Sequence, residues 1–390
     1  MTKIRTLASC LALAGLSALP AAAQTSLGQP TAVFPEDFGS IQTIRELPDG
    51  RVLVADPLSK MLFSVDMDGG TRVQVGSEGQ GPEEYRQPDA VWALPGDSTL
   101  LVDLGNGRLV VLGPDQGFGP TLPLALTEPR PGQPLVLALP QSVDGHGNIY
   151  SRAMGGMGMG QELPDSAQVL RISRDDRSYE AVASFKLADR TRTTSGGANN
   201  QNVSISNVPL SGEDAWGAAS DGSLVLARSG DYHIEWIAPD GTVTRGAPVP
   251  FEAIDIGRAE KEEYLTESGR SGGGIGIGVE MNNGSMSMSF QRGGTGRDEP
   301  GIEDYTWPAQ KPPFYQGRLP IDGMDRVWVR RHVEAGEAST YDVFDRSGSR
   351  VATYTLTAGK RVIGFGASSV YVVAYDEFDL NYLERYALPM

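Results

Sequence analysis

A unit of strand, turn and strand recurs about six times along this chain, and the recurrence constrains the fold more than any other feature. In the first copy, the turn Asp49-Gly50 precedes a β-branched run at residues 52–54, and a second apolar run follows at 61–65. Short β units of this kind cannot bury both of their faces alone. The copies must therefore stack on one another in a ring or a solenoid.

Six turns mark the copies, and their spacing favours a ring of blades. The turns are Asp49-Gly50, Gly96-Asp97, Asp144-Gly145, Asp221-Gly222, Asp322-Gly323 and Gly366-Ala367. Successive turns lie 48, 47, 77, 101 and 44 residues apart, and the three shorter steps match the blade lengths of known propellers. A short apolar run typical of a buried strand follows each turn, at residues 52–54, 100–102, 149–151, 224–226, 327–329 and 370–372. The sequence therefore predicts an all-β fold, a six-bladed β-propeller.

The last copy lacks one strand, and the N-terminal part of the chain can supply it. The sixth copy stops at Met390 before any outer strand, whereas residues 31–34 form a strand-like run outside the first copy. A closed ring exposes fewer free sheet edges than an open stack. We therefore expect an N-terminal strand to close the last blade.

The segment between the first two copies resembles a known connector. Residues 76–88 read Gly-Ser-Glu-Gly-Gln-Gly-Pro-Glu-Glu-Tyr-Arg-Gln-Pro. This run is similar to the connector of NHL-type six-bladed β-propellers, in which Gly-x-Gly-Pro-x-x-aromatic leads to a proline and the next inner strand. The resemblance is strongest over residues 41–113. It implies the architecture and no particular activity, because such propellers include enzymes and binding modules alike.

Two long insertions interrupt the repeat. The third copy is stretched at about 153–165 and 190–206, and the fourth is followed by residues 257–310. The latter segment contains a predicted short helix at 259–266 and a run at 271–301 that is rich in Gly, Ser, Asn and Met. Insertions of this length belong in surface loops, here over the mouth of the ring. We expect the glycine-rich parts to have no fixed conformation alone, because they offer little apolar surface to offset the ordering entropy, and any ordering to occur over the mouth of the ring.

The first 23 residues have the pattern of a signal peptide. Lys3 and Arg5 precede an apolar run at 7–19, and small residues follow at 21–23. We expect cleavage before Gln24, a single domain over 24–390 and a periplasmic or extracellular location. A lipoprotein-type box at residues 7–10 is an alternative, although cleavage there would leave an apolar stretch on the mature chain. No later segment approaches the roughly 18 apolar residues of a membrane span, so we expect no integral membrane segment after cleavage.

Charge and cysteine content exclude several classes of function. The formal net charge is −16, from 33 Lys and Arg against 49 Asp and Glu. This balance argues against nucleic acid and anionic membranes as partners. Cys10 is the only cysteine and lies inside the predicted signal peptide. The exported chain would therefore contain no disulfide, thiolate metal site or cysteine nucleophile.

Charged residues recur where the second strand of each copy ends. The residues at these equivalent positions are Asp56, Asp103, Arg152, Arg228 and Arg330. One interpretation is a ligand site at the ring mouth in which the three arginines bind a carboxylate or a phosphate. The alternative is that these side chains pair with one another or with nearby acids such as Asp376.

Methionine is concentrated in the insertions. Six of the 11 methionines lie there, and they are Met154, Met157, Met159, Met281, Met286 and Met288. Thioethers are soft ligands that suit Cu(I). The alternative is that they are adaptable contact residues on the loops.

A metal-dependent lactonase or esterase is the main enzymatic alternative. Such propellers hold a divalent ion on the axis with Glu, Asn and Asp from inner strands. The predicted inner strands are residues 41–47, 89–94, 135–139, 216–219, 317–321 and 362–365. Among these segments only Glu46 and Asp89 are acidic. The histidines His146, His233 and His332 fall in separate copies, which gives a nucleophilic triad little support.

The leading prediction is therefore a non-catalytic propeller that binds a small ligand or a protein partner at one face. The hydrolase is the alternative, and no pattern in the sequence names a cofactor.

Overall fold

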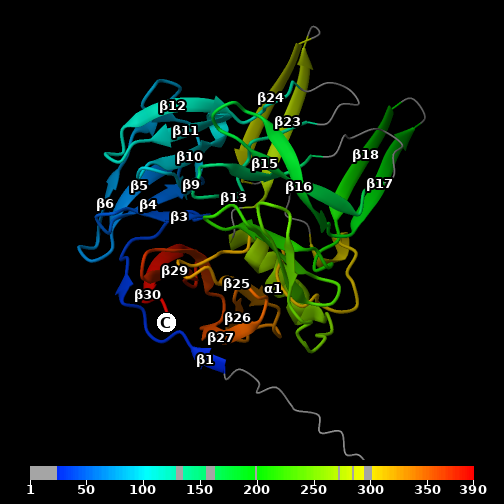
Figure 1. Ribbon diagram of the computed structural model, residues 1–390. Helices are drawn as coiled ribbons and strands as arrows, with labels where there is room; N and C mark the ends of the chain where they lie inside the picture. The colour runs from blue at the N-terminus through cyan, green and yellow to red at the C-terminus, as the bar shows by residue number, and fades with distance from the viewer. Residues whose placement is uncertain are drawn as a thin grey trace, which may run out of the picture.

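Six four-stranded sheets are arranged in a ring (Figure 1). The computed structural model describes residues 24–128, 135–154, 163–197, 200–270, 273–282, 285–293 and 301–390. The chain is an all-β six-bladed propeller, as the repeat predicts. The predicted signal peptide lies outside the described residues. In the described part of the chain, no helix combines the length and the apolar character that crossing a bilayer requires.

Each of the first four blades is an antiparallel meander of four consecutive strands. Blade one contains β3 (Ile44–Glu46), β4 (Val52–Asp56), β5 (Met61–Asp66) and β6 (Thr71–Gln74). Blade two contains β9 (Pro88–Ala93), β10 (Thr99–Asp103), β11 (Arg108–Leu112) and β12 (Phe118–Pro123). Blade three contains β13 (Ser142–Val143), β14 (Ile149–Arg152), β15 (Ser166–Ile172) and β16 (Tyr179–Lys186). Blade four contains β19 (Ala215–Ala218), β20 (Leu224–Arg228), β21 (His233–Ile237) and β22 (Val243–Arg245).

The N-terminal segment completes the last two blades. Blade five contains β25 (Val327–Arg331), β26 (Ser339–Phe344), β27 (Arg350–Leu356) and β1 (Gln24–Ser26). Blade six contains β28 (Arg361–Phe365), β29 (Ser369–Tyr375), β30 (Asn381–Ala387) and β2 (Ala32–Val33). β2 pairs antiparallel with β30, so the predicted closing strand is confirmed. The parallel pairing of β1 with β27 was not predicted from the sequence.

Two inner strands differ from the prediction. The innermost strand of blade three is β13 at 142–143, and the predicted residues 135–139 form only isolated bridges. In blade five the predicted segment 317–321 also forms only isolated bridges. Its backbone binds blade four instead, because Trp216 N–H donates to the Gly317 carbonyl at 3.2 Å and Leu319 N–H donates to the Trp216 carbonyl at 3.0 Å.

The recurring turns have a common chemical basis. The Asp144 carboxylate accepts hydrogen bonds from the backbone N–H groups of His146 and Asn148, both at 2.9 Å. Asp322 accepts two backbone N–H groups of its own turn in the same way. Asp side chains stabilise tight turns through such local bonds. This explains why an aspartate marks most copies of the repeat.

Six hydrophobic clusters occupy the six interfaces between neighbouring blades. Polar pairs add to them near the channel. The Thr43 hydroxyl donates to the Val91 carbonyl at 2.9 Å and accepts from Val91 N–H at 2.8 Å, which ties blade one to blade two. The Ser142 hydroxyl accepts from Ala218 N–H at 3.0 Å and so ties blade three to blade four. The ring therefore holds the inner strands at fixed positions around one space.

The connector between blades one and two is built around Tyr85. It contains the short parallel strands β7 (Ser77–Glu78) and β8 (Glu84–Tyr85). The Tyr85 side chain is fully buried, and its hydroxyl accepts from Leu62 N–H at 3.1 Å. Gly76 has φ of +71°, and a Cβ there would lie 2.6 Å from the Phe118 ring. A side chain at Gly76 is therefore excluded both by the backbone and by space.

In the described residues, the insertions at 190–206 and 257–310 contain regular structure as well as loops. They contain the hairpin of β17 (Arg190–Gly197) with β18 (Asn200–Asn207), the helix α1 (Arg258–Arg270), and the hairpin of β23 (Ile275–Asn282) with β24 (Ser285–Arg292). Both hairpins project from the ring in Figure 1. The predicted helix is confirmed and is longer than expected. The described part of 271–301 contains a hairpin that is held by contacts with the ring, and these contacts do not test its conformation alone. Two short 3-10 helices complete the structure, η1 (Leu104–Asn106) and η2 (Ile302–Asp304).

The second hairpin owes its order to contacts with blade two. Phe290 is buried in the cluster between blades two and three, with Met288 and Ile275 beside it. The Gln87 side chain bonds to both backbone groups of Arg292. A few apolar and polar anchors thus place this hairpin, and Arg292 with it, at the ring mouth.

Candidate functional site

A cavity of about 500 Å³ lies at the centre of the ring. Five of the six blades and the hairpin β23–β24 contribute residues to it. Its apolar wall includes Trp92, Leu139, Met154 and Ile275. Its charged residues are five arginines and one carboxylate, namely Arg152, Arg292, Arg318, Arg330, Arg361 and Asp89. The cavity is therefore cationic, although the chain as a whole is strongly acidic.

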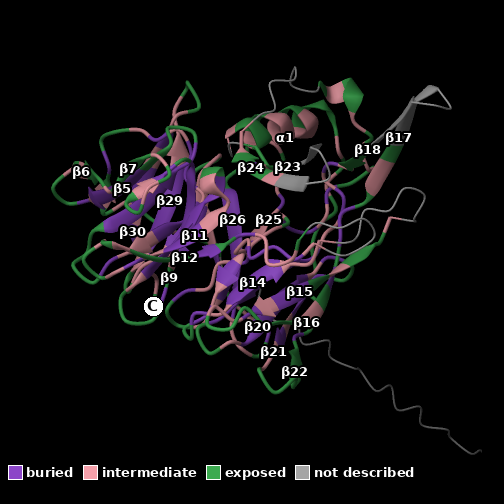
Figure 2. Cartoon of the chain, turned by 90° about the horizontal axis from the view of Figure 1, so that it is seen from above, coloured by how far each residue is buried: buried purple, intermediate pink, exposed green. Residues whose placement is uncertain are grey.

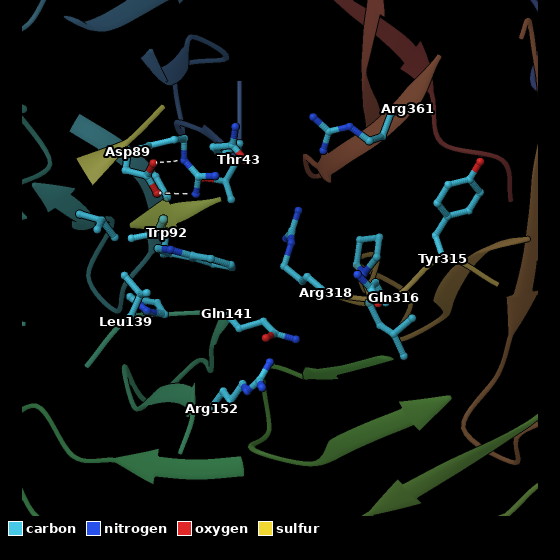
Figure 3. Close-up of a pocket in the computed structure, with 18 of the residues that line it drawn as sticks. Thr43, Asp89, Trp92, Leu139, Gln141, Arg152, Tyr315, Gln316, Arg318 and Arg361 are labelled. Carbon is cyan, nitrogen blue, oxygen red and sulfur yellow. Dashed lines mark hydrogen bonds and ion pairs between the residues drawn. The ribbon is translucent and has the colours of Figure 1, made fainter. Parts of the chain in front are cut away.

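Arg318 and Arg361 are the arginines without an acidic partner. Arg318 donates to the Ile363 carbonyl, and Arg361 donates to the Ile41 carbonyl at 3.2 Å. Among the described residues, neither guanidinium has a carboxylate within 4.0 Å. Burial and the nearby charge of Arg361 lower the pKa of Arg318 to about 10, so the Arg318 side chain is still a cation at neutral pH. Figure 3 shows both of them pointing into the same space.

Trp92 provides a flat wall beside this pair. The guanidinium carbon of Arg318 lies 5.2 Å from the centre of the indole ring, which is a cation–π distance. The Trp92 Nε1 atom is buried and has no hydrogen-bond partner in the described part of the chain. A buried donor without an acceptor is unusual and requires an explanation, such as a bound water or ligand.

Arg330 is held between an aromatic ring and an acid. It stacks over Tyr315 at 3.9 Å and donates to Glu267 of α1 at 2.5 Å. Burial alone would lower the pKa of Arg330, but Tyr315 and Glu267 outweigh that effect and raise it. Its Nε atom has no partner among the described residues. Arg330 is thus a permanent cation that connects α1 to the cavity wall.

The remaining two arginines have partners. Arg292 forms two hydrogen bonds with Asp89, one of them at 3.1 Å. Arg152 is partly exposed and lies 3.8 Å from Glu213, a distance that leaves its guanidinium accessible. Burial lowers the pKa of Arg152, and the Glu213 carboxylate opposes this only in part.

The structure brings two of the five residues predicted from the strand ends into the cavity, Arg152 and Arg330. Arg228 does not line it, because Asp214 at 3.0 Å and Glu235 at 2.7 Å hold its side chain between strands of blade four. The pairing alternative therefore describes Arg228, with partners other than Asp376.

The two predicted aspartates also lie outside the cavity. Asp56 is buried and accepts the backbone N–H groups of Gly39, Ser40 and Ser59. Asp103 is fully buried and accepts the N–H groups of two connector residues and the Arg108 side chain. Their geometry is that of caps for the segments entering each blade.

Sequence reasoning missed the two central arginines. Arg318 precedes β25 and Arg361 begins β28, so neither occupies the strand-end position that was compared between copies. The signal in the sequence that could have found them is an arginine at the start of a predicted inner strand, because inner strands line the channel of a propeller.

The donor set does not fit a resident divalent cation. Hard cations require several oxygen ligands, and the carboxylate in the cavity, Asp89, is engaged by Arg292. In the described ranges, no three His, Cys, Asp or Glu side chains are grouped so that they could hold a metal ion. Glu46, the other acid considered, accepts from the Tyr371 hydroxyl at 2.6 Å.

The methionines predicted to bind Cu(I) are only partly described. Met154 and Met288 pack against the same hydrophobic cluster. Met281 and Met286 occupy opposite positions on β23 and β24, and Met157 and Met159 lie outside the described residues. Copper binding remains a prediction that an anaerobic Cu(I) titration would test.

Comparison with known proteins gives no family. No family model matches the sequence, and no curated protein matches it. Similar solved structures include a catalytically inactive virginiamycin B lyase from Staphylococcus aureus with quinupristin, at 10% identity and a TM-score of 0.42, covering 93% of this chain and 99% of that one. A gluconolactonase from Xanthomonas campestris is 9% identical with a TM-score of 0.41, covering 95% and 99%. The calcium-binding protein regucalcin from Agrobacterium tumefaciens is 12% identical with a TM-score of 0.35, covering 94% and 97%. These similarities concern overall shape and assign no activity to this chain.

Proposed function

We propose that this chain is an exported, non-catalytic binding protein whose central cavity holds a small organic anion. The observation that carries the proposal is the pair Arg318 and Arg361, two cations in one cavity with only backbone carbonyls as partners among the described residues. The periplasmic or extracellular location rests on the N-terminal sequence pattern, and the assignment to NHL-type propellers rests on the connector at 76–88.

The cavity has more hydrogen-bond donors than acceptors. The carboxylates Asp89, Glu213 and Glu267 can offset three of the five arginines, which leaves two positive charges. Removing uncompensated charge even partly from water is costly, and a bound anion would offset that cost. Arginine forks suit the planar oxygens of a carboxylate or the oxygens of a phosphate.

The overall composition of the chain does not account for the positive charge of the cavity. The chain carries 16 more acidic than basic residues, so a cavity lined at random would be acidic. The local excess of arginine therefore supports selection for an anionic ligand. A small ligand is favoured over a protein partner because the two arginines lie inside the ring.

The hydrolase alternative has weaker support from the same residues. A resident divalent cation would have to share the space with Arg318 and Arg361, and like charges at this range repel. Hydrolysis by some other route would still require a group that activates water, and Asp89 is occupied by Arg292.

Calorimetric titration of the mature chain with inorganic phosphate, citrate and benzoate tests the proposal. We expect at least one of these anions to bind, and the Arg318→Gln and Arg361→Gln variants to bind it at least tenfold more weakly. A loss of one charge-assisted contact corresponds to about 1.5–3 kcal/mol, which agrees with that range.

Arg245→Gln is the matched control, because Arg245 is an exposed arginine on the outer strand β22 with one ion pair to Asp231. It should bind as the wild type does. Equal affinity in all three variants would exclude the cavity as the anion site. Turnover of lactones or aryl esters that depends on Ca²⁺ would instead favour the hydrolase.

A further inference from the structure

We infer that the ligand is an amphipathic anion with an aromatic or similarly flat apolar extension, and that the extension occupies a second cavity beneath α1. This inference rests on the proposed anion site. The second cavity has a volume of about 270 Å³. It adjoins the first at four residues that line both, Tyr315, Gln316, Arg330 and Arg361.

The wall of the second cavity is aromatic. Phe314 and Tyr315 form part of it from the blade-five side, Tyr375 from the end of β29, and Tyr264 from α1. The cavity is partly open to solvent, because the exposed residues Ser268 and Gln316 line it. Arg330 and His332 already stack on Tyr315, and Arg270 lies over Tyr375. A flat apolar occupant would therefore pack against the ring edges, in the edge-to-face geometry that aromatic pairs favour.

The helix above this cavity does not fill it. None of the α1 residues is buried, which Figure 2 shows as a helix coloured only as intermediate and exposed. Polar contacts attach the helix on the ring side, including Glu267 to Arg330 at 2.5 Å and Arg270 to Asp379 at 2.6 Å. Tyr264 adds aromatic contacts with Tyr305 and Trp307. A helix fixed in this way acts as a roof, and the space below it stays available.

The distribution of charged side chains indicates which part of the ligand binds in which cavity. In the second cavity Arg270 and Arg330 are already neutralised by Asp379 and Glu267, so it offers little to a second anionic group. Arg361 lines both cavities and has no carboxylate partner among the described residues. The anionic group of the ligand would therefore bind at Arg361 and Arg318, and the uncharged part would extend past Gln316, which is exposed and free of regular strand pairing.

Four probe molecules test separately whether binding depends on the negative charge, on the first ring and on the second ring. Inorganic phosphate carries the charge alone, benzoate adds one ring, and biphenyl-4-carboxylate adds a second ring in line with the first. Biphenyl-4-methanol has both rings and no charge. By calorimetry on the mature chain, we expect biphenyl-4-carboxylate to bind at least tenfold more tightly than benzoate and at least tenfold more tightly than the alcohol.

Two variants locate the second ring. Tyr375→Ala removes an aromatic wall, and Ser268→Phe places a ring in the cavity from the exposed side of α1. Both should abolish the tenfold advantage of the biphenyl probe and leave benzoate affinity within twofold of wild type. Tyr179→Ala, on the outer strand β16 with 47% of the residue exposed, is the control and should change neither affinity.

The outcomes distinguish this inference from the proposed function. Equal affinity for benzoate and biphenyl-4-carboxylate, or an advantage that survives both variants, would overturn the second cavity as a subsite while the anion site stands. Failure of every anion to bind, or binding unaffected by Arg361→Gln, would overturn both.

Discussion

His332 is a buried titratable side chain that lines the second cavity. Its ring stacks on Tyr315 with centroids 3.8 Å apart, and its Nδ1 atom has no partner among the described residues. Burial, followed by the positive charges of Lys311 and Arg330, lowers the pKa of His332 well below its usual value. The imidazole is therefore neutral in the folded chain.

This neutrality should make folding sensitive to acid. Below pH about 6.5 the unfolded chain takes up a proton at residue 332 that the folded chain does not, so stability falls as the pH falls. His332→Phe removes this group, so it should reduce the loss of unfolding free energy between pH 6.5 and 5.0. Urea denaturation at the two pH values measures this. The same replacement at His146, an exposed turn residue, is the control, and an equal effect there would contradict the assignment.

At the scale of elements, β2 is, together with β13, one of the two shortest blade strands in the described part of the chain, and it is one of the most consequential. It contains only Ala32 and Val33, yet it supplies the outer edge of blade six, and Phe34 directly after it is fully buried. Phe34 packs in the cluster between blades six and one, where Phe38 and Phe63 also lie. Ring closure therefore depends on one aromatic side chain beside a two-residue strand.

Replacing Phe34 tests this dependence. Phe34→Ala should lower the free energy of unfolding by about 3–5 kcal/mol, since it leaves a large cavity in a packed cluster. The neighbouring Val33 is 51% exposed, so Val33→Ala should change stability by about 0.5 kcal/mol or less. Urea titrations of both variants give the comparison. If Phe34→Ala lowered the free energy of unfolding by as little as Val33→Ala does, β2 would hold blade six through its backbone alone.

The repeat predicted the secondary-structure elements well, but it did not predict which side chains become neighbours in the folded chain. Asp-bearing turns and β-branched runs are local signals, and each of the six predicted central strands forms. Arg152 and Arg228 occupy equivalent strand ends, but Asp214 and Glu235 engage only Arg228. Those partners come from other segments of blade four, so sequence position could not separate the two arginines. Arg318 and Arg361 likewise become one site only when blades five and six are placed side by side.

The hairpin within the glycine-rich segment was missed for a similar reason. Residues 275–292 have little apolar surface of their own, which is why no fixed conformation alone was expected. The hairpin is ordered by the docking of Phe290 and Arg292 on blade two, about 200 residues earlier in the chain. Contacts between residues so far apart in the sequence cannot be recognised from the local composition.

At the scale of the whole molecule, an acidic exterior surrounds a cationic centre, and the ring that separates them is closed by its two ends. The six interfaces each hold one hydrophobic cluster, and the interface between blades six and one includes residues from both ends of the chain. The ring should therefore behave as one cooperative unit rather than as six independent blades.

Shortening the C-terminus tests this cooperativity. A chain that ends at Leu380 lacks β30, so β2 has no partner and blade six keeps two strands. We expect such a chain to lose its cooperative thermal transition, measured by near-ultraviolet circular dichroism. Deleting Met390 alone, which is fully exposed, should leave the transition unchanged. A sharp transition in the shorter chain would show that five blades suffice.

The pairing of β2 with β30 also limits when the nascent polypeptide can complete its fold. Residues 32–33 are translated about 350 residues before their partner at 384–385. Until that partner has been made, β2 cannot form its pairing. Blade six is therefore completed only after residues 384–385 have been synthesised, and any factor that handles the unfinished protein meets a ring that is still open.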